Sequence, residues 1–160
     1  MRKLFIMLFF ALSSPKLVAI CIGLGCSCRI DTVSPVAFGD YNPIVSTPHD
    51  RSGQFSVTCS VLGVGLNVSY TMALSTGLYG TFAARKMEYA GKLLSYNLYT
   101  TSGYTSVWGD GSFGTATVSE QYNLAVLFHT ATYTVFGRIP ASQIVGVGSY
   151  DDTVTISLTF

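Results

Sequence analysis

The sequence predicts an all-β sandwich, because three of its properties agree. Several segments alternate apolar and polar residues with the period of two that is typical of a strand with one buried face. Sixteen glycines, together with many serines and threonines, place turn signals between these segments. Ten tyrosines and ten phenylalanines supply aromatic side chains, which favour strands. The 160 residues leave room for a single domain and a leader.

The chain opens with a pattern that is typical of a secretory signal peptide. Two basic residues precede the nine-residue apolar run Leu4 to Leu12, and a stretch with small residues follows it. A membrane anchor is not expected, because a bilayer span needs about 20 apolar residues. We predict a signal peptide over residues 1–19, with cleavage between residues 13 and 25, and one domain over residues 26–160. Lipoprotein cleavage before Cys26 is an alternative.

Export would permit disulfide bonds, and the chain has four cysteines, Cys21, Cys26, Cys28 and Cys59. Four cysteines allow three complete pairings, and spacing alone does not choose among them. Pairing Cys28 with Cys59 would close a loop of about 30 residues, which the chain-entropy model values at roughly 3–4 kcal/mol. A zinc site is not expected, because one Cys-x-Cys without a nearby histidine lacks the usual ligand spacing.

Several segments before residue 137 alternate apolar and polar residues, and glycine-containing turns separate them. Phe113 adds a short extended run. Residues 81–92 contain helix formers, but glycines bound them and strands surround them, so we expect a loop or an irregular strand there. The main predicted strands cover residues 55–60, 66–74, 94–99, 122–128 and 131–136.

The clearest predicted strand is the last segment, residues 152–160. Its apolar residues fall on one face and its threonines and serine on the other, which is typical of a half-buried antiparallel strand. The apolar face consists of Val154, Ile156, Leu158 and Phe160.

Composition argues against several classes of function. Charged residues are 11% of the chain and the net charge is +1, so a nucleic-acid surface is not expected. Only two histidines, His49 and His129, are present, and a hydrolase Gly-x-Ser-x-Gly motif is missing. Residues 109–114 match Gly-x-Gly-x-x-Gly, but a strand-like segment follows, which indicates a hairpin turn rather than a dinucleotide site. We expect no enzyme activity, cofactor or metal.

Two arginines stand alone in apolar segments of the sequence. We expect Arg85 and Arg138 to lay their stems along apolar surface, or to bind backbone carbonyls inside the sandwich. Both interpretations are structural.

Several short segments, taken in order, carry a resemblance to a known family. They include Val36-Ala37-Phe38-Gly39-Asp40-Tyr41, then Gln54 to Cys59, then Val107-Trp108-Gly109-Asp110-Gly111, then Phe136-Gly137-Arg138-Ile139-Pro140. The chain resembles the spore coat protein U domain family, which includes subunits of the archaic, Csu-type chaperone–usher pili of Gram-negative bacteria. The resemblance runs from about Cys28 to Phe160, nearly the whole predicted mature chain.

The resemblance implies a pilin, which is an immunoglobulin-like sandwich that lacks its final strand. A periplasmic chaperone lends a strand during folding, and at the outer-membrane usher the N-terminal segment of a neighbouring pilus subunit replaces it. The resemblance also implies a Cys28–Cys59 disulfide and an acceptor groove flanked by Val154 to Phe160. It further implies export through the periplasm to a cell-surface pilus that serves adhesion or biofilm formation.

Family subunits carry a donor strand ahead of the first cysteine. The candidate donor here consists of Val18, Ile20, Ile22 and Leu24, which alternate correctly. Cleavage near residue 13 would keep all four, cleavage after residue 19 would leave a short donor, and cleavage near residue 25 would leave none. Cys21 and Cys26 are extra cysteines that would pair with each other if both are retained.

The alternative function is a stand-alone or tip adhesin on the cell surface. Aromatic residues on loops of a rigid sandwich can bind a sugar or an abiotic surface, and the candidates are Tyr104, Trp108 and Tyr133. For Trp108 we prefer packing in the core or a turn, since tryptophan is usually well buried.

Overall fold

The computed structural model describes residues 20–21, 24–62, 66–124 and 128–160. The predicted signal peptide, residues 1–19, lies outside the described residues. None of the described residues forms a helix long and apolar enough to span a bilayer. The regular elements of the described residues are β1 (Ile20–Cys21), β2 (Leu24–Ser34), β3 (His49–Leu62), β4 (Leu66–Leu74), β5 (Arg85–Tyr89), β6 (Lys92–Tyr99), β7 (Val118–Leu124), β8 (Phe128–Ile139) and β9 (Ile156–Thr159).

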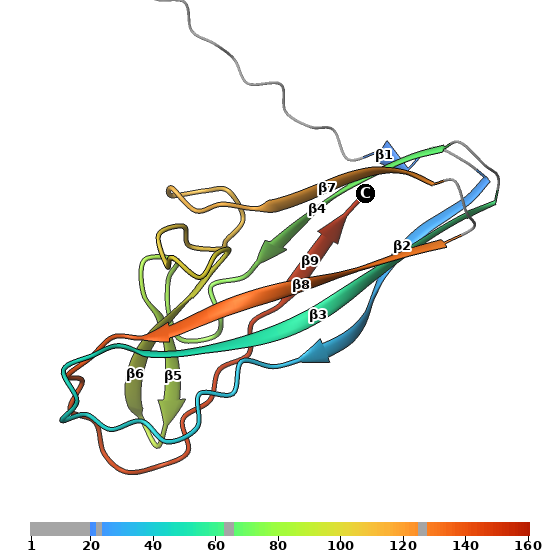
Figure 1. Cartoon of the computed structure of the whole chain (residues 1–160). Coiled ribbons are helices and arrows are strands. Elements are labelled where there is room, and N and C mark those ends of the chain that lie inside the picture. Colours follow the sequence, from blue (N-terminus) through green and yellow to red (C-terminus); the bar gives the residue numbers. More distant parts are fainter. Residues whose placement is uncertain (1–19, 22–23, 63–65, 125–127) are drawn as a thin grey trace, which may run out of the picture.

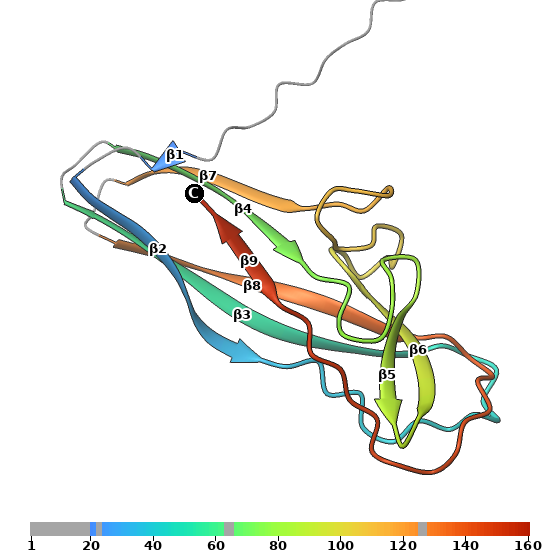
Figure 2. The same cartoon turned by 180° about the vertical axis from the view of Figure 1, so that it is seen from behind.

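Two antiparallel sheets make up the molecule, which confirms the predicted all-β sandwich (Figures 1 and 2). The five-stranded sheet has the order β2-β3-β8-β6-β5. In the four-stranded sheet β4 is central, because β7 pairs along one of its edges while β1 and β9 pair with it along the other. The core lies between the sheets, and burial of each large apolar side chain there contributes about 1.5–3 kcal/mol.

The β3–β8 ladder is the longest pairing described in the five-stranded sheet. It runs in unbroken register from the His49–Ile139 pair to the Ser60–Phe128 pair. Alternate β3 side chains, such as Phe55 and Val57, are no more than 1% exposed. The period of two in the sequence therefore correctly predicted which face of β3 enters the core.

The two ends of the described chain share one edge of β4. Thr159 of β9 lies opposite Thr71, and Ile20 of β1 lies opposite Ser69, so β1 continues the line of β9. Among the described strands none pairs with the other edge of β9. That edge faces the end of β2 across the opening between the sheets.

Residues 81–92, expected as a loop or an irregular strand, contain most of a regular hairpin. β5 and β6 pair from Arg85–Tyr96 to Tyr89–Lys92. The connecting turn places Ala90 at φ 49° and Gly91 at φ 77°, the two positive values that a tight primed hairpin turn requires. Helix formers in this stretch were overridden by pairing within the sheet.

Two details of the strand predictions were wrong. Phe113 is not in an extended run: it sits in a turn with φ 51° and is 94% exposed. The last strand pairs only over Ile156–Thr159, rather than over all of residues 152–160. Part of the predicted 122–128 strand, residues 125–127, lies outside the described residues.

Candidate functional site

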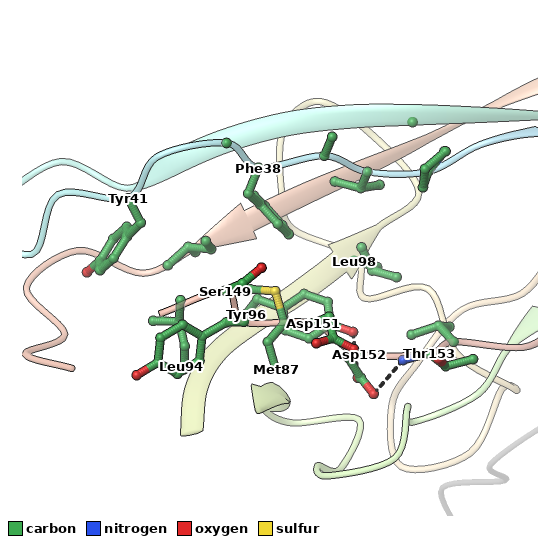
Figure 3. Close-up of a pocket in the computed structure, with 18 of the residues that line it drawn as sticks. Phe38, Tyr41, Met87, Leu94, Tyr96, Leu98, Ser149, Asp151, Asp152 and Thr153 are labelled. Carbon is green, nitrogen blue, oxygen red and sulfur yellow. Dashed lines mark hydrogen bonds between the residues drawn. The ribbon is translucent and has the colours of Figure 1, made fainter. Parts of the chain in front are cut away.

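A groove of about 1080 Å³ opens between the end of β2 and the segment that leads into β9. One side, here called the N-terminal wall, is residues 33–41, and the other, the C-terminal wall, is residues 145–156. In Figure 3 Phe38 and Tyr41 of the N-terminal wall face Tyr96, Met87 and Leu94 across the opening. The groove therefore follows the residues that lead into β9 and reaches the first residue of that strand, Ile156.

The N-terminal wall leaves the sheet at a proline. β2 ends at Ser34, and Pro35, which has no N–H to donate, follows it. The wall then passes over the inner face of β8 at Gly137, where a Cβ atom would lie 2.6 Å from Val36 Cγ1 and 2.8 Å from Phe38 Cζ. A glycine at this position leaves the space that the wall side chains occupy.

Core side chains from both sheets form the floor of the groove. Phe38 packs edge-on against Tyr96, with ring centroids 5.9 Å apart. Polar contacts also hold the wall. His49 Nε2 donates to the Phe38 carbonyl at 2.7 Å, and Tyr41 Oη donates to the Pro140 carbonyl at 3.2 Å. The floor residues are Phe55, Leu74, Met87, Leu94, Tyr96, Leu98, Val135 and Ile139.

The charged residues that line the groove have one sign. Its lining residues include Asp40, Asp151 and Asp152, and none of them is a lysine, arginine or histidine. Asp152 accepts a hydrogen bond from Tyr96 Oη at 2.7 Å. Burial, together with this carboxylate, raises the pKa of Tyr96 well above its usual value, so the phenol stays protonated and donates. The apolar floor suits apolar side chains, and the carboxylates disfavour acidic groups in an occupant.

The predicted acceptor strand lies beside this groove. Val154 and Ile156 line it, and these two residues and Leu158 are partly buried against the core. Phe160, predicted on the same core-facing side, is instead 42% exposed, because it follows the last paired residue of β9, Thr159. Neither Leu158 nor Phe160 lines the groove. The predicted alternation thus places Val154, Ile156 and Leu158 toward the core, while the serine and threonines between them are exposed.

Cys28 and Cys59 form a disulfide between β2 and β3, where they are register partners. Cys26 is also disulfide-bonded, and the side chain of Cys21 is outside the described part of the chain. The Cys28–Cys59 bond ties β2 to its neighbour, so it fixes the strand from which the N-terminal wall departs.

The candidate donor residues do not form one strand. Ile20 belongs to β1 and pairs with β4, whereas Leu24 begins β2 in the other sheet. Val18 and Ile22 lie outside the described residues. Use of this segment as a donor would first require β1 to leave β4.

The aromatic residues of the adhesin alternative do not gather on one exposed surface. Trp108 is 1% exposed and its Nε1 donates to the Met72 carbonyl at 3.1 Å, as the preference for core packing predicted. Tyr133 is hydrogen-bonded to Tyr70, with 2.5 Å between their hydroxyl oxygens. Tyr104 covers the Arg138 guanidinium, which lies 3.8 Å from its ring centroid.

The two histidines have separate structural partners. His49 binds the Phe38 carbonyl, and the His129 ring lies 4.3 Å from that of Tyr122. Within the described residues no group of three histidine, cysteine, aspartate or glutamate side chains is arranged to hold a metal.

Sequence reasoning predicted Val154 and Ile156 at the groove but missed the N-terminal wall and the rest of the C-terminal wall. Residues 35–41 form no strand, so alternation gave no signal for them. Two residues could have indicated the N-terminal wall. Pro35 follows the end of a strand, and Gly137 leaves room on the inner face of β8 for the wall side chains.

Comparison with known proteins agrees with this geometry. A family profile, the Spore Coat Protein U domain, matches residues 16–157. The chain belongs to the Spore Coat Protein U domain family. It is also similar to Protein U of Myxococcus xanthus, with 32% identity over 136 residues, which cover 77% of this chain and 70% of that relative.

A solved structure shares the fold of this Spore Coat Protein U domain. It is the crystal structure of the CsuC–CsuE chaperone–tip adhesion subunit pre-assembly complex from archaic chaperone–usher Csu pili of Acinetobacter baumannii. The TM-score is 0.54 at 24% identity, over 84% of this chain and 40% of the matched chain. The chain thus spans less than half of that protein, and the likeness shows a common fold.

Proposed function

We propose that this protein is a structural subunit of a chaperone–usher pilus, and that its groove accepts a β-strand from a partner protein. The observation that carries this proposal is the unpaired edge of β9 beside an apolar groove of about 1080 Å³. An added strand would pair with a free backbone edge, and its alternate side chains would fill the groove.

An open groove of this kind is costly in water. Its lining includes Val33 and Val147, which are 58% and 103% exposed, above a floor of core side chains. An unpaired edge and an apolar groove are both sites of unwanted association, so a partner that covers them during export stabilises the chain. This fits successive complementation by a periplasmic chaperone and by a neighbouring subunit, with the exchange at an outer-membrane usher.

Membership of the Spore Coat Protein U domain family supports this proposal, because a structure of the same fold comes from an archaic chaperone–usher system. We propose the same route for this chain: export through the periplasm, assembly at the cell surface, and a role in adhesion or biofilm formation. The acidic lining predicts that the incoming strand is apolar and carries no acidic residue near Asp151.

Co-expression tests the proposal. The chain would be produced in the periplasm alone and with a cognate periplasmic chaperone, and soluble yield and co-purification would be measured. We expect a yield that depends on the chaperone and a one-to-one complex. A chain that is soluble and monomeric alone, with a cooperative thermal transition and no chaperone binding, would exclude strand acceptance.

A further inference from the structure

The segment that leads into β9 is held by individual contacts rather than by a continuous ladder. Asp151 makes one isolated bridge with Glu88 of β5, and beyond it side chains supply most of the contacts. Asp152 Oδ1 accepts from Leu78 N and from Thr153 N, each at 2.8 Å, and its Oδ2 accepts from Tyr96 Oη at 2.7 Å. Figure 3 shows Asp152 beside Thr153 at the edge of the groove. One carboxylate therefore joins the C-terminal wall both to the loop after β4 and to the groove floor.

Ser75 makes the second attachment of this segment. Its N–H donates to the Thr155 carbonyl at 3.0 Å, and its Oγ accepts from Thr155 N at 2.9 Å. The loop fits closely against the wall, because a Cβ on Gly77 would lie 1.9 Å from Asp152 Oδ2. Both backbone polar groups of Thr155 thus bind the same residue.

Arg85 fixes Ser75 from the core side. Its Nε and Nη2 donate to the Ser75 carbonyl at 2.9 and 2.7 Å, and Nη2 also donates to the Trp108 carbonyl at 2.7 Å. Its Nη1 donates to Asn97 Oδ1 at 2.7 Å. The side chain is 0% exposed, so water cannot replace these acceptors. Burial lowers the pKa of Arg85, whereas Tyr96 and Asp152 favour its charged form.

We propose that Ser75, Arg85 and Asp152 form a latch that holds residues 152–155 in place, so that the groove stands open before a partner strand arrives. This inference rests on the proposed function of the groove as a strand acceptor. A partner that meets an ordered wall does not have to order it on binding, which lowers the free-energy cost of association. Asp152 is a positioning residue in this scheme.

Hydrogen exchange in the isolated, oxidised chain measures the latch without any partner. Asp152→Ala removes all three hydrogen bonds of the carboxylate, whereas Asp151→Ala removes an exposed neighbour of equal charge. We expect the amides of residues 153–156 to exchange about tenfold faster in Asp152→Ala and within about twofold of the parent in Asp151→Ala. The amides of Val57 and Val135 report on the core and should not change.

Two further variants distinguish the loss of specific hydrogen bonds from a general loss of folding. Asp152→Asn retains an acceptor for Leu78 and Thr153, and its amide can donate to Tyr96, so wall exchange should return close to that of the parent. Ser75→Ala removes the acceptor of Thr155 N and should raise exchange at Thr155. Unchanged wall exchange in both Asp152→Ala and Ser75→Ala overturns the latch.

Binding kinetics with the chaperone give the functional readout. For Asp152→Ala we expect the association rate to fall about tenfold, with dissociation within about twofold, because only the free groove is altered. An association rate of Asp152→Ala equal to that of the parent chain would overturn the role of the latch in keeping the groove open. If the parent chain itself does not bind the chaperone, the proposed function is wrong. The exchange measurement needs no chaperone, so it still tests the latch.

Discussion

Arg85 joins several segments on the groove side of the molecule through buried hydrogen bonds. It is fully buried, and its donors go to two backbone carbonyls and one side-chain amide oxygen. The sequence left two roles open for Arg85 and Arg138, a stem along apolar surface or bonds to backbone carbonyls. Arg85 takes the second role, whereas Arg138 binds the Asp50 carboxylate. The acceptors were not predictable, since Ser75 and Trp108 are brought together only by the packing of distant loops.

Replacing Arg85 tests this dependence. In Arg85→Met the Ser75 and Trp108 carbonyls lose buried donors, and each unpaired buried group costs about 1–3 kcal/mol. We predict a loss of roughly 3 kcal/mol in the free energy of unfolding, measured by urea denaturation. The matched variant is Arg138→Met, whose partner Asp50 is partly exposed, and it should lose less than about 1 kcal/mol. Equal losses in the two variants would be at odds with this assignment.

Asp50 makes a pH-dependent contribution to stability. Its hydrogen bonds with Arg138, at 2.7 and 2.8 Å, hold the pKa of this carboxyl below its usual value. A carboxyl with a lowered folded-state pKa stabilises the fold above its unfolded-state value of about 3.9, and the benefit disappears as the pH falls through the folded-state pKa.

We therefore predict a difference between the parent chain and Asp50→Asn in thermal melts over the acid range. The melting temperature of the parent should exceed that of the variant at neutral pH, and the gap should close as the pH falls below about 4. A gap that is constant with pH would show that the ion pair contributes nothing through titration.

Strand β9 shows what alternation can and cannot predict. The core-facing side of residues 153–158 was predicted because alternate residues of an extended chain point to opposite faces, whether or not every residue is paired. The paired length was not, because residues 152–155 bind Ser75, Leu78 and Tyr96 through individual contacts. The N-terminal wall was missed for a similar reason, since it is ordered by packing against Gly137 and by His49 rather than by a ladder.

Introducing a carboxylate on each face of β9 in turn, and measuring soluble yield, distinguishes the core-facing side of the strand from its exposed side. Leu158→Asp places a carboxylate among apolar residues that pack against the core, whereas Ser157→Asp places one on the exposed face of the same strand. Burial of an unpaired charge is costly, so Leu158→Asp should abolish chaperone-dependent soluble yield. Ser157→Asp should keep at least about half of it. If both variants accumulate equally, β9 does not border the acceptor site.

For the whole molecule, the two sheets, the Cys28–Cys59 bond and the open groove describe a sandwich with one strand position unfilled. The fold class followed from composition and alternation, because each strand reports its own buried face. The groove is a property of the assembled sheets, and its walls come from residues 33–41 and 145–156, far apart in the sequence.

The central claim is that a partner strand occupies this groove. The most direct test compares amide exchange in the chain alone and in its one-to-one complex with the chaperone. We predict new protection along residues 154–159 and in the N-terminal wall, with little change on β7. Protection confined to the outer face of β3 and β8, with β9 exchanging as in the free chain, would contradict strand acceptance at this site.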